Sequence, residues 1–378
     1  MNRKINFIIV FILLGQLLLA QNTIPIIRAT SNIVHIRDGI TFMQGYLQTN
    51  SALEPEIYRT ANKSSKVTFY TDLDSISFNV QPNKNYDFNI LLNEIDSTFV
   101  RIKYAPSFLE TLKGAKEFNL LDNREIPEFT YQEKDNLNLV ALRKGFNLDS
   151  VAGTGNEVSK ILNVLHWIHR VIPHDGNSEN PQIKNAMSLL TVCKRDNRGL
   201  NCRGLATVMN ECYLSLGIKS RIITCLPKDP NDTECHVINM VYSNDMQKWL
   251  WIDPTNDAYV MNEKGELLSI EEVRERLITD KPLILNPDAN WNFESSTIKE
   301  EYLYNYMSKN LYRFECPINS EYDFETTQKG KEMIYLQLLP IDYPKQKPDK
   351  TESTNNNDGT TIISYKTNSP EIFWKAPK

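Results

Sequence analysis

The sequence reads LNCRGLATVMNECYLSLGIKSRI at residues 200–222, ECHVINMVY at residues 234–242 and KWLWIDPT at residues 248–255. In this stretch a helical pattern is followed by strand-like runs, which predicts a mixed helix-and-strand core. Three reactive side chains, Cys202, His236 and Asp253, lie at the edges of these predicted elements.

Cys202 opens a predicted helix. Apolar side chains recur at spacings of three and four as far as Leu216, and Gly217 then supplies a helix stop. A thiol in the first turn lies at the positive end of the helix dipole, which favours the thiolate. The position of Cys202 therefore predicts a reactive nucleophile.

His236 and Asp253 lie at the ends of two predicted strands. His236 begins the run at residues 236–242, and Asp253 follows the run at residues 249–252. The separations leave room for a helix, a strand and a loop between Cys202 and His236, and for a hairpin between His236 and Asp253. Two neighbouring antiparallel strands would then bring an imidazole and a carboxylate to a thiol at a helix tip. The order Cys, His, Asp predicts a nucleophile, a general base and a group that orients the base.

Four motifs in this stretch resemble the transglutaminase-like superfamily of papain-type cysteine enzymes. The family pattern has a Cys at a helix start, a Gly-Ile-x-x-Arg strand, a strand that begins with His, and a strand that ends in Trp-x-x-x-Asp-Pro-Thr. The matching segments are Cys202-Arg-Gly-Leu-Ala206, Gly217-Ile-Lys-Ser-Arg221, His236-Val-Ile-Asn239 and Trp249-Leu-Trp-Ile-Asp-Pro-Thr255. The resemblance is clear over residues 200–255 and extends weakly upstream to about residue 130.

The resemblance implies a papain-like α+β domain with Cys202, His236 and Asp253 as its catalytic triad. It implies neither a metal nor an organic cofactor. An amide at a helix N-terminus has no intrahelical partner, so the backbone N–H of Cys202 is expected to stabilise an oxyanion. Asn201 and Asn197 are the nearest candidates for a second donor.

We expect an enzyme that acts on peptide or carboxamide bonds through a thioester. Cross-linking members of the family favour Trp directly after the Cys, where this chain has Arg203, and no calcium-binding Asp-x-Asp-x-Asp loop occurs in the sequence. Hydrolysis, as a protease or amidase, is therefore favoured. Two alternatives remain: a protein-glutamine transglutaminase, and a non-catalytic peptide- or glycan-binding protein on the same fold.

Residues 1–20 predict an export signal. Arg3 and Lys4 precede a nearly continuous apolar run to Leu19, and Ala20 is suited to signal cleavage. The run is shorter than the roughly 20 residues of a membrane span. We expect an exported protein, periplasmic or extracellular, with no integral membrane segment after cleavage.

Charge and cysteine content narrow the function classes. The formal net charge of −5 with mixed signs argues against nucleic acid as a partner. A protein or peptide substrate is expected, with cell-wall peptide as one candidate.

The six cysteines have neither a disulfide-framework nor a zinc spacing, so zero disulfide bridges are favoured over two, and one bridge remains an alternative. Cys235 is expected to point away from His236 and into the core.

Residues 21–125 predict an all-β, sandwich-like N-terminal domain. Turn signals separate short runs of alternating apolar and polar residues, at Lys66–Tyr70, Ser75–Val80, Tyr86–Leu91 and Thr98–Tyr104. This spacing is typical of an antiparallel sandwich.

Residues 126–290 are expected to form the catalytic domain. A capping-box pattern at residues 154–157 precedes an amphipathic helix that carries His166 and His169. No further ligand follows these histidines at metal-binding spacing, so we interpret them as a surface or packing pair. His174 in the next loop is interpreted as solvent-exposed and as a reserve candidate for the general base.

Residues 291–378 are expected to form a C-terminal extension that contains strands. Residues 291–311 are rich in aromatic side chains and predict a helix, whereas residues 331–339 and 361–365 predict strands. Residues 345–359 are polar and rich in Pro and Asn, which predicts a mobile loop.

Overall fold

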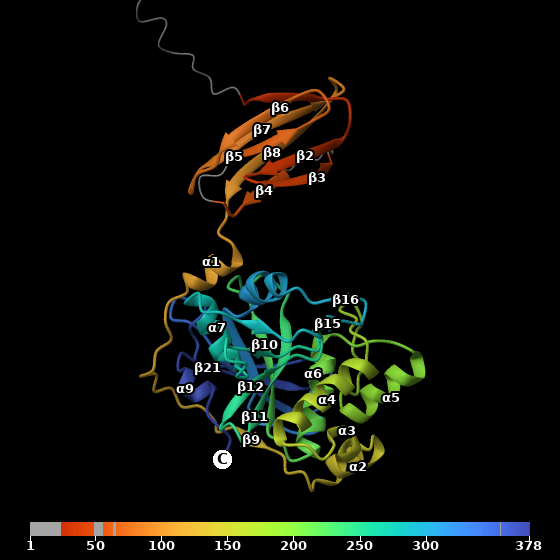
Figure 1. Cartoon of the computed structure of the whole chain (residues 1–378). Helices are drawn as coiled ribbons and strands as arrows, with labels where there is room; N and C mark the ends of the chain where they lie inside the picture. Colours follow the sequence, from red (N-terminus) through yellow and green to blue (C-terminus); the bar gives the residue numbers. More distant parts are fainter. Residues whose placement is uncertain (1–23, 49–55, 63–65, 356) are drawn as a thin grey trace, which may run out of the picture. The chain divides into compact units, whose positions relative to one another are not determined.

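A computed structural model describes residues 24–48, 56–62, 66–355 and 357–378 (Figure 1). The expected export signal at residues 1–20 lies outside these residues. Within the described part of the chain, no helix is long and apolar enough to cross a membrane. The chain divides into two compact units between Ser107 and Phe108.

The N-terminal unit is a β-sandwich of two four-stranded sheets. One sheet has the order β1 (Ile26–Ala29), β7 (Asn85–Leu92), β8 (Asp96–Tyr104), β4 (Glu56–Thr60), and the other β3 (Thr41–Gln48), β2 (Ile33–Asp38), β5 (Lys66–Tyr70), β6 (Ser75–Asn79). Their apolar faces share one core, in which Phe69 and Phe88 meet edge to face at 4.9 Å. The sandwich prediction is confirmed, but the unit is not purely antiparallel. The edge strands β1 and β4 pair in parallel with β7 and β8, because long connections rather than hairpins join them.

The C-terminal unit is built on a seven-stranded sheet. Its order is β12 (Lys248–Ile252), β11 (His236–Ser243), β10 (Ser220–Leu226), β17 (Arg313–Pro317), β19 (Glu332–Leu338), β21 (Thr361–Thr367), β20 (Lys350–Thr354). The strands that carry the predicted site and those of the C-terminal extension thus belong to one continuous sheet. Residues 126–290 and 291–378 consequently fold as one unit, and the expected α+β class with a β-containing C-terminus is confirmed.

Helices cover both faces of this sheet (Figure 1). One layer contains α2 (Leu137–Gly145), α3 (Leu148–Ala152), α4 (Glu157–Val171), α5 (Ala186–Asp196) and α6 (Cys202–Ser215). The other contains α1 (Phe108–Lys113), α7 (Ile270–Ile278), the π-helix η1 (Glu300–Met307), α8 (Ser308–Asn310) and α9 (Pro370–Phe373). Short paired strands complete the unit: β9 (Thr130–Tyr131), β13 (Val260–Met261), β14 (Ile284–Leu285), β15 (Asn290–Trp291), β16 (Ser295–Ser296) and β18 (Asn319–Ser320). Because both faces are covered, the residues of β10 to β12 are buried almost throughout.

Helix α4 begins later than its sequence pattern predicts. Asn156, not Thr154, is the N-cap, and its side chain accepts a hydrogen bond from the backbone N–H of Ser159 at 2.8 Å. Glu157 does not complete a capping box, because its carboxylate accepts hydrogen bonds from the Ser243 hydroxyl and the Asp245 backbone. The capping-box prediction is therefore wrong, since Glu157 instead ties α4 to the turn between β11 and β12.

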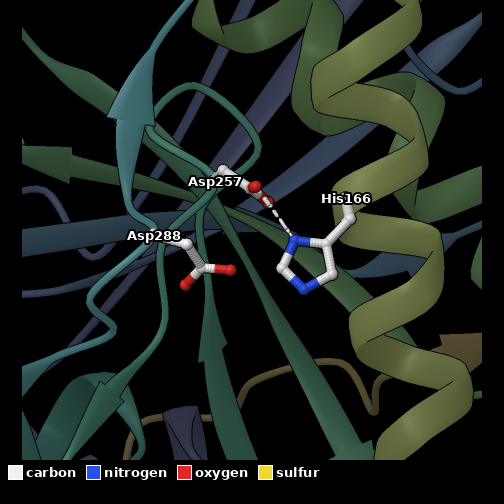
Figure 2. A group of neighbouring side chains, drawn as sticks. All are labelled: His166, Asp257 and Asp288. Atoms are coloured by element: carbon white, nitrogen blue, oxygen red, sulfur yellow. Dashed lines mark hydrogen bonds and ion pairs between the residues drawn. The ribbon is translucent and has the colours of Figure 1, made fainter. Parts of the chain in front are cut away.

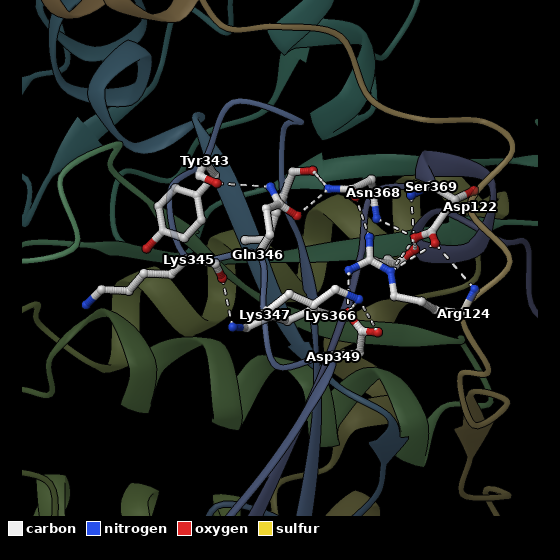
Figure 3. A network of polar contacts seen from close by, with 12 residues as sticks. Asp122, Arg124, Tyr343, Lys345, Gln346, Lys347, Asp349, Lys366, Asn368 and Ser369 are labelled. Atoms are coloured by element: carbon white, nitrogen blue, oxygen red, sulfur yellow. Dashed lines mark hydrogen bonds and ion pairs between the residues drawn. The ribbon is translucent and has the colours of Figure 1, made fainter.

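A polar network explains why residues 108–125, which the sequence assigned to the N-terminal domain, lie in the C-terminal unit (Figure 3). Asp122 accepts hydrogen bonds from Arg124, from the Thr367 hydroxyl and from the Asn368 backbone. Burial raises the pKa of Asp122, but these donors outweigh it and lower the pKa to about 2. The Asp122 carboxylate thus attaches residues 108–125 to the end of β21.

Two predictions for the C-terminal residues are wrong in part. The segment 345–359 is not entirely a loop, because Lys350–Thr354 forms β20, paired antiparallel with β21. Its polar composition is that of a solvent-facing edge strand. Within residues 291–311, the β15–β16 hairpin precedes the helical part, which begins only at Glu300.

Candidate active site

Cys202 begins α6 at the floor of a cleft of about 820 Å³. The helix starts here because Asn201 caps it, accepting a hydrogen bond from the Gly204 backbone at 3.1 Å. A Cβ on Gly204 would lie 2.7 Å from Asn180 Oδ1 and 3.0 Å from Leu200 Cβ, so a larger residue here would displace the side chains packed against the helix start. The first helical turn is therefore held in place on both sides.

The structure brings the three predicted site residues together. His236 begins β11 and Asp253 follows the neighbouring strand β12. His236 Nε2 lies 2.8 Å from Asp253 Oδ2, and the Cys202 thiol is hydrogen-bonded to the His236 side chain. Since Nε2 is committed to Asp253, Nδ1 is the nitrogen left for the sulfur. The arrangement can move a proton between thiol and imidazole while the carboxylate holds the ring.

Asp253 is fully buried and every partner of its carboxylate is a donor. Oδ2 accepts from Tyr302 Oη at 2.6 Å and from Asn256 Nδ2 at 3.1 Å, besides His236, while Oδ1 accepts from the Thr255 backbone at 2.8 Å. Burial raises the pKa of Asp253, but the charge and hydrogen bond of His236, with the other donors, lower it to about 2. Asp253 therefore supplies a permanent negative charge behind the imidazole.

The negative charge of Asp253 affects the protonation of His236 and Cys202. Burial lowers the pKa of His236, but Asp253 outweighs it and raises the pKa well above its ordinary value. Burial likewise raises the pKa of Cys202, whereas hydrogen bonds from His174 and His236 lower it to about 6. At neutral pH the site thus holds a thiolate beside an imidazolium, which is the reactive form of a nucleophilic cysteine.

The segment that contains Cys202, His236 and Asp253 matches a known protein family. Residues 144–254 match the family model of the transglutaminase-like superfamily, which includes all three site residues. The chain carries a transglutaminase-like domain.

Solved structures similar to the chain overlap it only partly. A candidate cysteine protease from Cytophaga hutchinsonii is 20% identical, with a TM-score of 0.26 over 34% of this chain and 40% of its own. A transglutaminase is 17% identical, with a TM-score of 0.23 over 31% of this chain and 31% of its own. Red sea bream transglutaminase is 12% identical, with a TM-score of 0.21 over 62% of this chain and 49% of its own. This chain spans less than half of each. No curated protein matches it.

The two predicted side-chain oxyanion donors lie at the ends of the helices α5 and α6, and of the two only Asn201 lines the cleft. Asn201 uses its oxygen to cap α6, and its Nδ2 donates to the Ser178 carbonyl at 3.3 Å. Asn197 ends α5 in a left-handed conformation, with φ of 48°, and does not line the cleft. Both residues lie close to Cys202 in sequence because Asn197 is the C-cap of α5 and Asn201 is the N-cap of α6.

Arg203, which follows the nucleophile, is held by two partners outside the triad. Its guanidinium lies 3.2 Å from Glu325 Oε1 and donates to Thr224 Oγ1 at 2.9 Å. The hydrogen bond to Thr224 on β10 ties the first turn of α6 to the sheet, and the ion pair ties it to the segment between β18 and β19.

Four aromatic or imidazole side chains complete the site, and of these the sequence indicated only His174, as a reserve candidate for the general base. Tyr302 bonds Asp253, and Tyr306 packs edge to face on His236 with ring centroids 5.3 Å apart. His174 contacts the thiol of Cys202, so it is not a purely solvent-exposed residue, and Trp291 donates to it. The spacing of the two tyrosines places them near each other on η1, but no local pattern indicates that η1 returns to the nucleophile.

All six cysteines are free thiols. Cys235 lines the same cleft as Cys202, because it precedes β11 and does not follow the alternation of the strand. The expectation that it points into the core is wrong. Cys193, Cys212, Cys225 and Cys316 are buried, and burial raises the pKa of each.

The two histidines of α4 clamp the loop that follows Asp253. His169 is buried, with Nδ1 3.0 Å from the Pro254 carbonyl and Nε2 2.9 Å from Asn290 Oδ1. His166 Nδ1 lies 2.8 Å from Asp257 Oδ1, and the hydrogen bond and charge of Asp257 raise its pKa (Figure 2).

His166 and Asp257, together with Asp288, also bring three possible metal-ligand atoms within 4.8 Å of one another (Figure 2). The carboxylates come from distant parts of the sequence, which local ligand spacing cannot reveal. None of the three residues lines the cleft, and the His166–Asp257 contact is accounted for as an ion pair that fixes the loop.

Proposed function

We propose that this chain is an exported cysteine-dependent acyl-transfer enzyme that cleaves peptide or carboxamide bonds. The observation that carries the proposal is the Cys202 thiol in the cleft beside the buried His236–Asp253 pair, together with a thiol pKa lowered to about 6. A structural cysteine gains nothing from an imidazole backed by a buried carboxylate, whereas a nucleophile requires it.

The reaction follows from the protonation states. The Cys202 thiolate attacks the carbonyl carbon, a C–S bond forms and the carbonyl electron pair moves to oxygen. When the tetrahedral intermediate collapses, the C–N bond breaks and the His236 imidazolium gives its proton to the leaving amine. A water molecule then attacks the thioester, His236 takes a proton from it, and the thiolate leaves with a carboxylic acid as product.

The cleft supports a peptide or protein substrate. Besides the triad it is lined by small polar side chains, among them Asn177, Thr233, Ser295 and Thr297. The same cleft is lined by apolar surface from Trp291, Ile298 and Tyr306. This mixture suits a peptide, whose backbone needs hydrogen-bond partners and whose side chains need apolar contacts. Cell-wall peptides belong to this class, and the export signal at residues 1–20 would deliver the enzyme to the periplasm or the cell exterior.

Water is the favoured acceptor. The position after the nucleophile holds Arg203, paired with Glu325, in place of the Trp of the cross-linking enzymes. Transglutamination remains the alternative, in which an amine attacks the same thioester.

The test is the pH dependence of Cys202 alkylation by iodoacetamide, with His236→Ala as the comparison. Labelling of the wild type is expected to have a midpoint near pH 6, and the variant is expected to label with the ordinary thiol midpoint, roughly two units or more higher. An ordinary thiol profile in both proteins would contradict the mechanism and favour the binding-protein alternative.

A substrate screen then separates the acceptors. Peptides and glutamine amides are incubated with and without a fluorescent primary amine, and free ammonia, new N-termini and amine incorporation are measured. Cys202→Ala is the blank. New termini or ammonia without amine incorporation support hydrolysis, whereas amine incorporation in competition with water supports the transglutaminase alternative.

A further inference from the structure

The cleft contains a second imidazole in contact with the nucleophile, and it belongs to His174. The segment that carries it lies against the residues leading into α6: Asp175 donates to the Leu200 carbonyl at 2.8 Å, and Leu200 donates to the Pro173 carbonyl at 3.1 Å. A side chain at Gly199 would collide with the Pro173 carbonyl, so a glycine there permits this close pairing. His174 is thereby placed directly beside Cys202.

The backbone and the ring of His174 are both fixed by the β15–β16 hairpin. Asn292 accepts from the His174 backbone N–H at 2.7 Å and donates back to its carbonyl at 2.9 Å. The ring Nδ1 lies 3.1 Å from Trp291 Nε1, and the two rings are nearly perpendicular, at 72°. The hairpin therefore holds one specific orientation of the imidazole.

This contact also decides where the proton of His174 lies. An indole nitrogen can only donate, so Nδ1 of His174 must accept and cannot carry a proton. The neutral ring then has its proton on Nε2, and the hydrogen bond that lowers the pKa of Cys202 is a donation from Nε2–H to sulfur. His174 is thus held as a hydrogen-bond donor and cannot serve as the general base.

We propose that His174 is a catalytic residue whose Nε2–H stabilises the oxyanion, with Trp291 as the residue that positions it. This proposal rests on the proposed acyl-transfer function. As the thiolate attacks, the C–S bond forms and the negative charge leaves sulfur for the carbonyl oxygen. A fixed donor beside the sulfur can follow that charge, together with the Cys202 backbone N–H at the start of α6.

The role of His174 can be separated from an effect on the thiolate by two small reagents. Iodoacetamide alkylates sulfur by displacement of iodide, and no oxyanion forms. 4-Nitrophenyl acetate acylates the same sulfur through a tetrahedral oxyanion before 4-nitrophenolate leaves. Limiting rates of both reactions are measured well above the midpoint of the thiol titration, where Cys202 is a thiolate in every variant, and the Cys202→Ala rate is subtracted.

His174→Ala is expected to lower the limiting acylation rate by roughly 100-fold or more and to leave the limiting alkylation rate within about threefold. Trp291→Phe keeps the imidazole but releases its Nδ1, so a smaller loss, about two- to tenfold and confined to acylation, is expected. His35→Ala in the N-terminal unit and Trp167→Phe on α4 are matched controls that should change neither rate.

Each other outcome overturns the proposal in a recognisable way. A parallel fall of acylation and alkylation in His174→Ala would mean that His174 acts only on the thiolate, and an unchanged acylation rate would exclude an oxyanion role. If His174→Ala does not fold, an unchanged acylation rate in Trp291→Phe decides against the proposal. A wild type that is alkylated at low pH, yet acylated no faster than Cys202→Ala, would remove the proposed function itself and this role with it.

Discussion

His236 Nε2 lies 2.8 Å from Asp253 Oδ2, and both side chains are shielded from solvent. The Asp253 carboxylate can accept hydrogen bonds but cannot donate them. The proton between the two groups is therefore on His236 Nε2, which leaves Nδ1 to face Cys202. Asp253→Asn is expected to lower the acylation rate about 10²- to 10⁴-fold, because an amide can donate to the ring and select the wrong tautomer. The measurement is pre-steady-state acylation by 4-nitrophenyl acetate.

A matched control for this change is Asp149→Asn on α3, whose side chain is exposed and far along the chain from the triad. It should leave the acylation rate unaltered. Full activity of Asp253→Asn would remove Asp253 from the mechanism, even though the geometry is intact.

The pH profile of kcat/KM is expected to be bell-shaped. Activity should fall as the pH drops through about 6, because the Cys202 thiolate is then protonated. Asp253 raises the pKa of His236 above its ordinary value, so the imidazolium that protonates the leaving group persists at neutral pH, and the second fall lies on the alkaline side. A rising limb centred on the ordinary thiol pKa would show that the ion pair does not form.

Tyr302→Phe tests the support behind the triad. The phenol donates to Asp253 Oδ2 at 2.6 Å, and its loss raises the pKa of Asp253 and weakens the hold on the carboxylate. A two- to tenfold lower acylation rate is expected, which corresponds to about 0.5–1.5 kcal/mol for one hydrogen bond. Tyr304→Phe, two residues along η1 and half-buried, is the control. Equal rates in the two variants would show that Tyr302 has only a packing role.

The local part of the site could be predicted from the sequence. The helix that starts at Cys202 and the strands that begin with His236 and end before Asp253 are decided by short-range periodicity and stop signals, and each lies where its pattern places it. The N-cap of α4 was less predictable, since Thr154 and Asn156 are both residue types that cap helices. Glu157 bonds to the turn near Ser243, a contact distant in sequence, and so does not form a capping box.

The long-range part of the site could not be predicted. Tyr302 lies 49 residues after Asp253, and His174 and Trp291 are separated by 117 residues. They meet because the β15–β16 hairpin and η1, which follow β12 by about 40 residues or more, return to the cleft. Local periodicity in the sequence cannot predict such a long-range contact. For the same reason sequence proximity alone indicated Asn201 and Asn197 as oxyanion donors, whereas the structure shows that Asn201 Oδ1 caps α6 and that Asn197 ends α5 outside the cleft.

Arg221 is a motif residue whose role is structural. Its guanidinium is almost completely buried, lies 3.6 Å from the centre of the Phe129 ring, and donates to the Phe373 and Lys375 carbonyls at 2.8 and 2.7 Å. It therefore fastens residues 373–375 to β10, and it does not line the cleft. Its conservative substitution should affect folding and not chemistry.

Arg221→Lys is expected to destabilise the C-terminal unit by about 2–3 kcal/mol, because one ammonium cannot reproduce the planar fork and leaves buried carbonyls without donors. Urea unfolding followed by tryptophan fluorescence measures this, since all five tryptophans lie in residues 108–378 and report on that unit alone. Arg195→Lys, on an exposed ion pair with Asp196, should change stability by less than about 0.5 kcal/mol. Equal stability of the two variants would show that the buried guanidinium does not anchor the terminus. A folded Arg221→Lys protein in mild conditions should keep the wild-type acylation rate, since Arg221 touches none of the reacting groups.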